Sequence, residues 1–392
     1  MILNVLCSFL QTIKYILLGK KLDVLLYYPQ HFNRSSKGSN PYFDPIVEVC
    51  KENELKYLVM EEPDSRTSNP RAPQCMKADA FFWMVTIMRK LMRMIYKEKT
   101  SVETDVKIAH FLDVITSHKF RAKWYITISN SMINILAELN PEGVVYDYQH
   151  GIIFNGHPGY FAEKDNLASS YKNSNRRMML WGTLYRQAFE RALCKEDLDK
   201  KIKIVGYPIP ASTAGIVSQT REFIVISLQI TSDSEVWYKH SVKMLYECLE
   251  QLKESGYKVL LKHHPRFNNE VDLSDIVIKY PFVGFVSKPL VELVPQTLLH
   301  ITWSSTTCFE YANYGVPTFF LVDEVLSHGT TIFYEQYHYP LYKEMSLLEV
   351  VAHVVDKQEY KEDCKIVKKW YDSAYAPFDK QQILKILTGN ED

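Results

Sequence analysis

Short apolar runs alternate with helical patterns along the whole chain, and this alternation restricts the fold more than any other feature. Six apolar runs in the first half indicate buried strands, at 21–28, 56–61, 124–129, 144–148, 178–181 and 202–205. Helical patterns lie between them near 76–97, 102–118, 130–139 and 183–195. Strands that alternate with helices are typical of βαβ units, which build parallel sheets covered by helices. We therefore expect an α/β fold.

A break in this pattern divides the chain. Residues 208–215 (PIPASTAG) form its clearest linker, because proline and small residues dominate them. The alternation then restarts with strands at 223–228, 257–262, 283–286, 298–302 and 317–322, and a helical pattern fills 346–388. We expect two Rossmann-like domains that face a central cleft. The first spans 1–210, a linker spans 211–221 and the second spans 222–392, with terminal helices able to pack back on the first.

Charge and cysteine usage narrow the possible partners and the compartment. Residues 1–210 carry 29 Lys and Arg against 22 Asp and Glu, and the remainder carries 17 against 24. A basic first half suits an anionic membrane surface or an acidic acceptor, and no nucleic-acid partner is expected. The seven cysteines are scattered without a Cys-x-x-Cys pair, which favours a reducing cytoplasm and argues against zinc. The expected location is the cytoplasm, with peripheral contact at the inner face of the plasma membrane left open.

Two segments have amphipathic patterns. Residues 1–18 are apolar apart from polar residues that share one helical face, and they lack the basic leader of a secretory signal. Residues 88–99 form a basic amphipathic helix. The sequence leaves two interpretations open for these segments. The first is an ordinary structural one, in which 1–18 packs on the protein's own sheet and 88–99 is solvated. The second is contact with anionic lipid.

Polar residues follow two predicted strands of the second domain. The strand at 257–262 leads into Lys262, His263, His264, Pro265 and Arg266. The strand at 298–302 leads into Ser304, Ser305, Thr306 and Thr307, with Glu310 one helical turn later. The carboxyl ends of parallel strands are where open α/β sheets bind ligands. Hydroxyl groups at a helix start bind phosphate but also serve as ordinary caps, and strand alternation favours His264 over His263.

A second polar cluster follows the strand at 144–148 in the first domain. Gln149, His150 and Gly151 begin a glycine-containing loop that also holds His157. A reaction in which the hydroxyl of an acceptor attacks needs a base to take its proton, and a histidine or a carboxylate can serve near neutral pH. His150 is the first candidate; Asp147 is the second, or it orients His150. His31, Gln149 and His157 are the expected acceptor contacts, and ordinary loop hydrogen bonding is the competing interpretation for the histidines.

The order of these signals resembles the donor domain of GT-B glycosyltransferases, in particular enzymes of bacterial surface-polysaccharide synthesis. The His-Pro pair, the Ser/Thr turn, Glu310 and the Gly-Val-Pro entry to the next strand at 315–317 follow one another as in that domain. Similar His-Pro and Ser-Ser motifs occur in bacterial sialyltransferases, in Kdo transferases of capsule assembly and in CDP-glycerol glycerophosphotransferases of teichoic acid synthesis. The resemblance covers the motif layout and the two-domain plan.

The resemblance implies a role for each matching residue. His264 would contact the donor phosphate and assist catalysis, Ser304 and Ser305 would hold that phosphate, and Glu310 would hold the ribose. Lys262, Pro265, Arg266 and Thr306 complete the expected donor site. Related sialyl- and Kdo-transferring enzymes use a carboxylate base in the first domain, which keeps Asp147 beside His150 as a candidate.

The function implied is a glycosyltransferase, inverting and independent of metal, that acts on a growing cell-surface glycan such as capsule or lipopolysaccharide. Its expected partners are a nucleotide-sugar donor, CMP-linked in preference to UDP-linked, and a glycan or glycolipid acceptor. The nucleotide-sugar is a substrate, so no cofactor is expected. Two further functions stay open: a CDP-polyol phosphotransferase of teichoic-acid type, and a non-catalytic scaffold of polysaccharide assembly that shares the fold.

Overall fold

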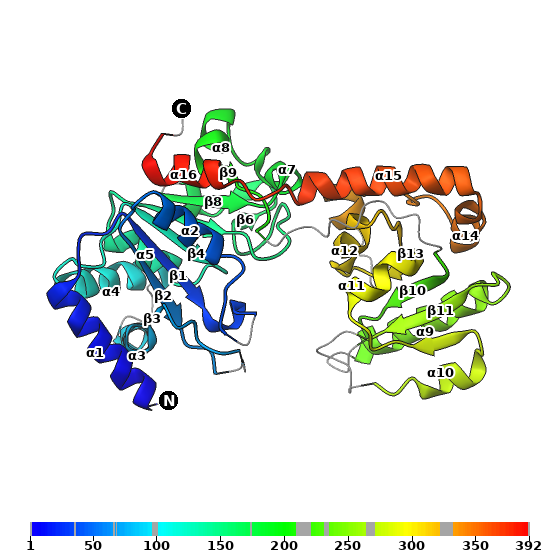
Figure 1. Ribbon diagram of the computed structural model, residues 1–392, viewed down its shortest axis with the longest axis horizontal. Helices are drawn as coiled ribbons and strands as arrows, with labels where there is room; N and C mark the ends of the chain where they lie inside the picture. Colours follow the sequence, from blue (N-terminus) through cyan, green and yellow to red (C-terminus); the bar gives the residue numbers. More distant parts are fainter. Residues whose placement is uncertain are drawn as a thin grey trace. The chain divides into compact units, whose positions relative to one another are not determined.

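The chain divides into two units, each built on its own parallel sheet (Figure 1). The first unit holds Met1–Pro210 and Ala376–Asp392, and the second holds Ala211–Tyr375. The computed structural model describes residues 2–34, 37–65, 67, 69–95, 101–172, 175–208, 221–230, 235–263, 271–321 and 332–390. The chain therefore leaves the first unit, builds the second and returns to the first.

In the described part of the first unit, seven parallel strands form a sheet in the order β3-β2-β1-β4-β5-β8-β9. They are Val24–Pro29 (β1), Tyr57–Glu62 (β2), Met76–Lys77 (β3), Trp124–Ile128 (β4), Val144–Tyr148 (β5), Arg176–Leu180 (β8) and Ile202–Ile204 (β9). All six residues of β1 are buried, as expected for a central strand covered on both faces. The strand order reverses between β1 and β4, which makes the carboxyl ends of these strands the switch point of the sheet.

Helices cover this sheet, and a small hairpin follows β5. The helices are Ile2–Leu18 (α1), Asp44–Glu52 (α2), Asp79–Ile95 (α3), Ser101–Ile115 (α4), Ile133–Leu139 (α5), Ser169–Lys172 (α6), Thr183–Arg186 (α7), Lys195–Lys201 (α8) and Lys380–Thr388 (α16). The hairpin pairs Phe161–Glu163 (β6) with Asn166–Leu167 (β7).

In the described part of the second unit, five parallel strands take the order β12-β11-β10-β13-β14. They are Phe223–Ser227 (β10), Lys258–Lys262 (β11), Val283–Phe285 (β12), Thr297–Thr302 (β13) and Thr318–Phe320 (β14). The helices are Glu235–Leu252 (α9), Ser274–Lys279 (α10), Leu290–Leu293 (α11), Thr307–Asn313 (α12), Leu347–Val355 (α14) and Lys357–Ala374 (α15). The order reverses between β10 and β13, so this sheet has a switch point as well.

The return of the chain to the first unit depends on a close backbone approach. Tyr207 N donates to Ala376 O over 2.8 Å, and Asp379 N donates to Val205 O over 2.9 Å. Gly206 lies between these bonds with φ of +80°, and a Cβ there would stand 2.0 Å from Pro377 O. The approach therefore needs glycine for both space and backbone conformation. It brings α16 against α2.

The predicted α/β fold with two Rossmann-like parallel sheets is confirmed, while several boundaries differ from prediction. The helix expected over 183–195 is broken, because α7 and a 3₁₀ turn, Gln187–Phe189, end before 190 and α8 begins at Lys195. The helical run expected over 346–388 is divided at Asp356, whose side chain caps α15 by accepting from two backbone N–H groups. The linker at 211–220 lies outside the described residues. The predicted cleft concerns the placement of the two units and stays a prediction.

Candidate functional site

The switch point of the second unit carries the hydroxyl-rich turn that the sequence singled out. Ser304, Ser305 and Thr306 follow β13 after Trp303 and lead into α12. Ser305 is buried, Ser304 and Thr307 are half-buried, and Thr306 is exposed. Hydroxyls of graded exposure therefore stand at the carboxyl end of β13, beside the end of β10.

A glutamine on the neighbouring strand end holds this turn. Oε1 of Gln229 accepts from Ser304 N over 2.8 Å and from Thr302 Oγ1 over 3.2 Å. The carbonyl of Gln229 accepts from Trp237 Nε1 over 2.8 Å, which ties the residue to α9. The turn is thus fixed across the switch point, from β10 to β13.

A buried histidine of β13 lies next to the turn, with its Nε2 3.5 Å from Thr307 Oγ1. His300 Nδ1 lies 2.9 Å from Thr318 Oγ1, and its Nε2 lies 2.9 Å from Ser227 Oγ. Its ring stacks on Tyr311 with centroids 3.8 Å apart. Complete burial holds the pKa of His300 well below 6.5, so the ring is neutral and joins β10, β13 and β14 by hydrogen bonds. Thr307 Oγ1 adds a bond of 2.9 Å to Ser305 Oγ.

The other predicted donor residues differ in their relation to the turn. Lys262 is half-buried at the end of β11 and pairs in register with Ser227, so it lies at the same edge as the turn. His263 stacks on Phe285 with ring centroids 5.0 Å apart. Glu310 is exposed on α12, a helix of seven residues whose dipole contributes little. His264, Pro265 and Arg266 lie outside the described residues.

In the first unit, a histidine and a carboxylate pair at the carboxyl ends of β1 and β2. His31 Nδ1 donates to Asp64 Oδ2 over 2.7 Å, and 44% of the His31 side chain is exposed. A carboxylate that accepts from Nδ1–H fixes the tautomer, so Nε2 is the nitrogen that can accept a proton from another group. The pair therefore has the arrangement of a base and the group that orients it.

Glu62 lies close to this pair. It is half-buried, accepts a short hydrogen bond from Ser131 Oγ, and interacts electrostatically with His31. Burial raises the pKa of Glu62, although the bond from Ser131 and the electrostatic interaction with His31 oppose the change. A carboxyl group thus adjoins the His31 imidazole at the same sheet edge.

A hollow of about 670 Å³ opens at this place. Its lining includes Gln30, His31, Glu62, Asp64, Phe82 and Trp83. Acidic and amide side chains beside aromatic rings suit a polyhydroxylated ligand, because carboxylates accept bonds from hydroxyls and rings cover apolar faces. The hollow lies wholly within the first unit.

Asp147 has a different environment from an accessible base. It is 1% exposed, and its two oxygens accept from Asn130 N over 3.2 Å and from Tyr160 Oη over 2.8 Å. Burial raises the pKa of Asp147 to about 7, although both hydrogen bonds act in the opposite direction. Its partners are residues other than His150, so the structure gives it the role of bracing the loop after β5.

The remaining residues of this cluster divide by exposure. His150 is exposed and lies beside the Phe32 ring, and partial burial together with His157 and His31 lowers its pKa. Gln149 is buried, donates to Gly151 O and accepts from Trp181 N. His157 accepts from Gly159 N over 3.1 Å and packs against Tyr160. His150 and His31 are therefore the more accessible imidazoles, and Gln149 shapes the loop.

Sequence reasoning missed several residues that shape the two edges. Gln229 follows β10 and His300 lies within β13, and no local motif marks either of them as a support of the turn. Glu62 ends β2 and Asp64 follows it, in the run Glu-Glu-Pro-Asp, a cluster of acidic residues at a predicted strand end that could have been noted. They pair with residues 33 and 69 positions away, so their partners could not be read from the local sequence.

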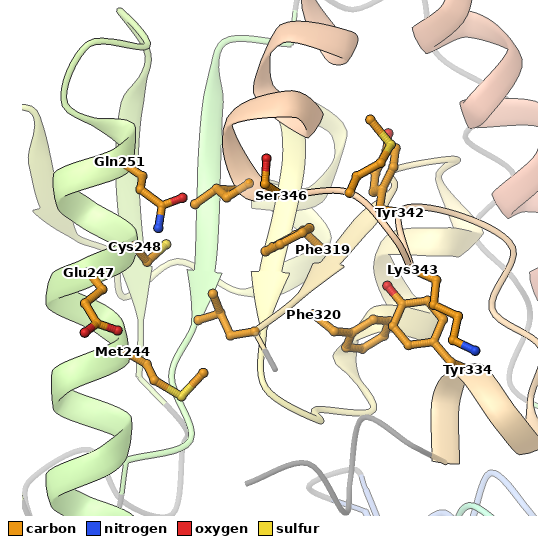
Figure 2. A pocket seen from close by; sticks show the side chains of 13 residues that line it. Met244, Glu247, Cys248, Gln251, Phe319, Phe320, Tyr334, Tyr342, Lys343 and Ser346 are labelled. Atoms are coloured by element: carbon orange, nitrogen blue, oxygen red, sulfur yellow. The ribbon is translucent and has the colours of Figure 1, made fainter. Parts of the chain in front are cut away.

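Another hollow, of about 350 Å³, lies in the second unit between α9 and β14 (Figure 2). Met244, Glu247 and Gln251 line it from α9, and Phe319 lines it from β14. Its lining includes no residue of the 304–307 turn. We therefore do not assign the donor to it. Within the described residues, no three His, Cys, Asp or Glu side chains are grouped as metal ligands would be.

No protein-family model and no curated protein matches the sequence. Solved structures do match. The wall teichoic acid polymerase TagF matches with a TM-score of 0.52 and 13% identity over 99% of this chain and 98% of that one. A glycotransferase of kitacinnamycin matches with a TM-score of 0.52 and 9% identity over 94% of this chain and 99% of that one. The lipopolysaccharide outer core galactosyltransferase WaaB matches with a TM-score of 0.51 and 9% identity over 94% of this chain and 99% of that one. At these identities the likeness shows the fold, which is GT-B.

Proposed function

We propose that this chain is a glycosyltransferase that moves a sugar from a nucleotide-activated donor to a cell-surface glycan. One observation carries the proposal: the hydroxyl-rich turn, fixed by Gln229 and His300, stands at the switch point of the second sheet. Ligands of open α/β sheets bind at such points. The GT-B fold of the chain, shared with a wall teichoic acid polymerase and a lipopolysaccharide galactosyltransferase, supports the same conclusion.

The turn suits the phosphate of a leaving nucleotide. When the bond to the sugar breaks, negative charge develops on the phosphate, and donors that are already in place stabilise it without reorganisation. Ser304 and Thr306 offer hydroxyls, and Lys262 brings a positive charge to the same edge. His264 and Arg266 stay predicted phosphate contacts from the sequence, and Glu310 stays the predicted ribose contact.

The first unit would supply the base. His31 Nε2 would take the proton of the acceptor hydroxyl while the oxygen attacks the anomeric carbon and the nucleotide leaves with the bonding electrons. Asp64 would stabilise the imidazolium that forms. His150 is the second candidate for the same step. Direct attack of this kind inverts the configuration of the sugar. A cell-surface glycan grows on a carrier at the membrane, so we expect contact with the inner face of the plasma membrane.

A second candidate function is transfer of a polyol phosphate from a CDP-linked donor. The match to the wall teichoic acid polymerase TagF favours it, because that match covers nearly the whole of both chains. In that reaction the acceptor oxygen attacks phosphorus, and CMP leaves. The two functions differ in the bond that is formed, so analysis of the glycan product for phosphorus separates them.

Thermal stabilisation by nucleotides tests the donor site. We expect CMP, CDP or UDP to raise the melting temperature, with no rise in a variant carrying Ser304→Ala and Thr306→Ala. Ser274→Ala, which removes an exposed hydroxyl at the start of α10, is the matched control and should behave as the wild type. Equal stabilisation of all three proteins would place the nucleotide elsewhere. No stabilisation of the wild type by any nucleotide would favour a non-catalytic scaffold.

A further inference from the structure

Helix α1 packs on the first unit through its polar side. Ser8 is fully buried, donates to Lys77 O over 2.6 Å and accepts from Ala80 N over 2.9 Å. Gln11 Oε1 accepts from Lys77 N, and Asn4 Oδ1 accepts from Lys77 Nζ. The face that the sequence marked as polar is thus the face that contacts the protein.

The opposite side of α1 is apolar and exposed. Its large side chains with exposures between 38% and 74% are Leu3, Leu6, Phe9, Leu10, Ile13, Leu17 and Leu18. At 100° per residue, Leu6, Ile13 and Leu17 lie roughly opposite Ser8 on the helix. An amphipathic helix of a protein surrounded by water usually buries its apolar side. An apolar row of this length therefore indicates a surface that another apolar phase covers.

Helix α3 extends this surface. It packs against α1 (Figure 1) and exposes a second apolar row. The row consists of Trp83, Ile87, Leu91, Met94 and Ile95, with exposures between 37% and 67%. Tryptophan is the side chain that most favours the boundary between a bilayer and water.

The charges on these helices identify the covering phase. α1 contains no Asp or Glu, and the carboxylate of α3, Asp79, is buried against Arg71. Lys14, Lys90 and Arg93 are exposed among the apolar side chains, and a hollow of about 600 Å³ is lined by Lys90, Arg93 and Met94 among others. Cations beside apolar rows match anionic lipid headgroups above acyl chains. A second copy of this surface would instead bring like charges together.

We propose that the outer faces of α1 and α3 form the surface by which this protein lies on an anionic lipid bilayer. The apolar rows enter the boundary between headgroups and acyl chains, and Lys14, Lys90 and Arg93 contact lipid phosphates. None of the helices in the described chain has the length and apolarity needed to cross a bilayer. The proposal goes beyond the transfer reaction and stands if that reaction is wrong, because it rests on these two helices alone.

Vesicle sedimentation with the full chain tests the surface. We expect binding to vesicles of phosphatidylcholine with phosphatidylglycerol, weaker binding to phosphatidylcholine alone, and a decline as salt increases. Leu6→Gln with Leu17→Gln should weaken binding by about tenfold or more, since each leucine loses its burial in lipid. Lys90→Glu with Arg93→Glu should remove the preference for the anionic vesicles. Ile278→Gln, at a residue 84% exposed on α10 of the second unit, is the control and should bind as the wild type.

Two results would overturn the proposal. The first is vesicle binding that the leucine pair leaves unchanged while circular dichroism shows all variants folded. The second is a wild type that ignores vesicles but sediments as a dimer that the leucine pair dissociates, since a second copy would then cover the surface. Nucleotide stabilisation, measured on the same leucine variant, should equal that of the wild type.

Discussion

Two buried titratable groups, one in each unit, show how a residue's surroundings decide its protonation. His300 is neutral because burial opposes its charged form, and hydroxyls satisfy both ring nitrogens. Asp147 keeps its proton to about pH 7 because burial outweighs its two hydrogen bonds. Neither group is accessible, so both are expected to influence the stability of the protein more directly than its chemistry.

The first prediction concerns Asp147. Its pKa is near 3.8 in the unfolded chain and about 7 in the folded protein, so the folded state holds a proton between these values that the unfolded state has released. The contribution of this group to the free energy of unfolding therefore falls as pH rises from 4 to 7, by at most about 1.4 kcal/mol per pH unit. Asp147→Asn should flatten that decline in urea unfolding measured at several pH values. The exposed Glu142→Gln is the control, and an unchanged slope in Asp147→Asn would contradict the assigned protonation.

The second prediction distinguishes the two candidate bases. If His31 takes the acceptor proton, His31→Gln lowers kcat by roughly 10²- to 10⁴-fold with KM nearly unchanged. Asp64→Asn should lower kcat less than His31→Gln does, because the imidazolium that forms loses its partner. His150→Gln should then retain most activity. The reverse pattern, with His150→Gln inactive and His31→Gln active, would transfer the role to His150.

Residues of the polar turn could be predicted because they are contiguous in the sequence. Ser304, Ser305 and Thr306 follow a run of apolar residues, and that order alone places them at the end of a strand. Gln229 lies 75 residues before Ser304, and only the pairing of β10 with β13 brings the two together. The supporting residues therefore became visible only in the folded sheet.

At the scale of elements, continuous apolar runs predicted the central strands well, since strands buried on both faces leave no polar interruption. Short elements were missed. Helix α2 begins with Asp44 and a proline, which is a usual start signal. Its nine residues mix apolar and charged side chains too closely for a helical period to stand out. Helix α1 was expected from its periodicity, while the side that faces the protein was fixed by Lys77 on a distant strand.

The third prediction belongs to the segment that returns to the first unit. Gly206 and Gly256 both have positive φ, but a Cβ at Gly206 meets Pro377 O, and one at Gly256 meets nothing within 4 Å. Gly256→Ala should cost about 1 kcal/mol from backbone strain alone. Gly206→Ala should cost more, about 2 to 4 kcal/mol, because the segment that leads to α16 must also move. Equal losses in urea unfolding would show that the close approach contributes nothing.

For the whole molecule, alternation of strands and helices predicted two parallel sheets, and the switch point of each sheet collects the polar residues on which the proposed function depends. The second unit holds the hydroxyl-rich turn, to which we assign the donor phosphate, and the first holds the His31 imidazole with its Asp64 partner beside a hollow lined by acidic, amide and aromatic side chains. Strand order is set by long-range pairing, so the sequence predicted the kind of sheet but left the position of each switch point to the structure. This arrangement supports the proposal that the second unit binds the donor and the first unit binds the acceptor.

Release of nucleotide from activated donors tests the proposed transfer most directly. The wild type is incubated with CMP-, CDP- and UDP-linked donors and a bacterial glycolipid fraction, and the nucleotide products are separated by ion-exchange chromatography. We predict release from one donor class that depends on the acceptor, falls by about 10²-fold in the Ser304→Ala and Thr306→Ala variant, and persists in Ser274→Ala. A folded protein that releases nucleotide from none of these donors, or releases it equally in all three proteins, would contradict the proposed transfer.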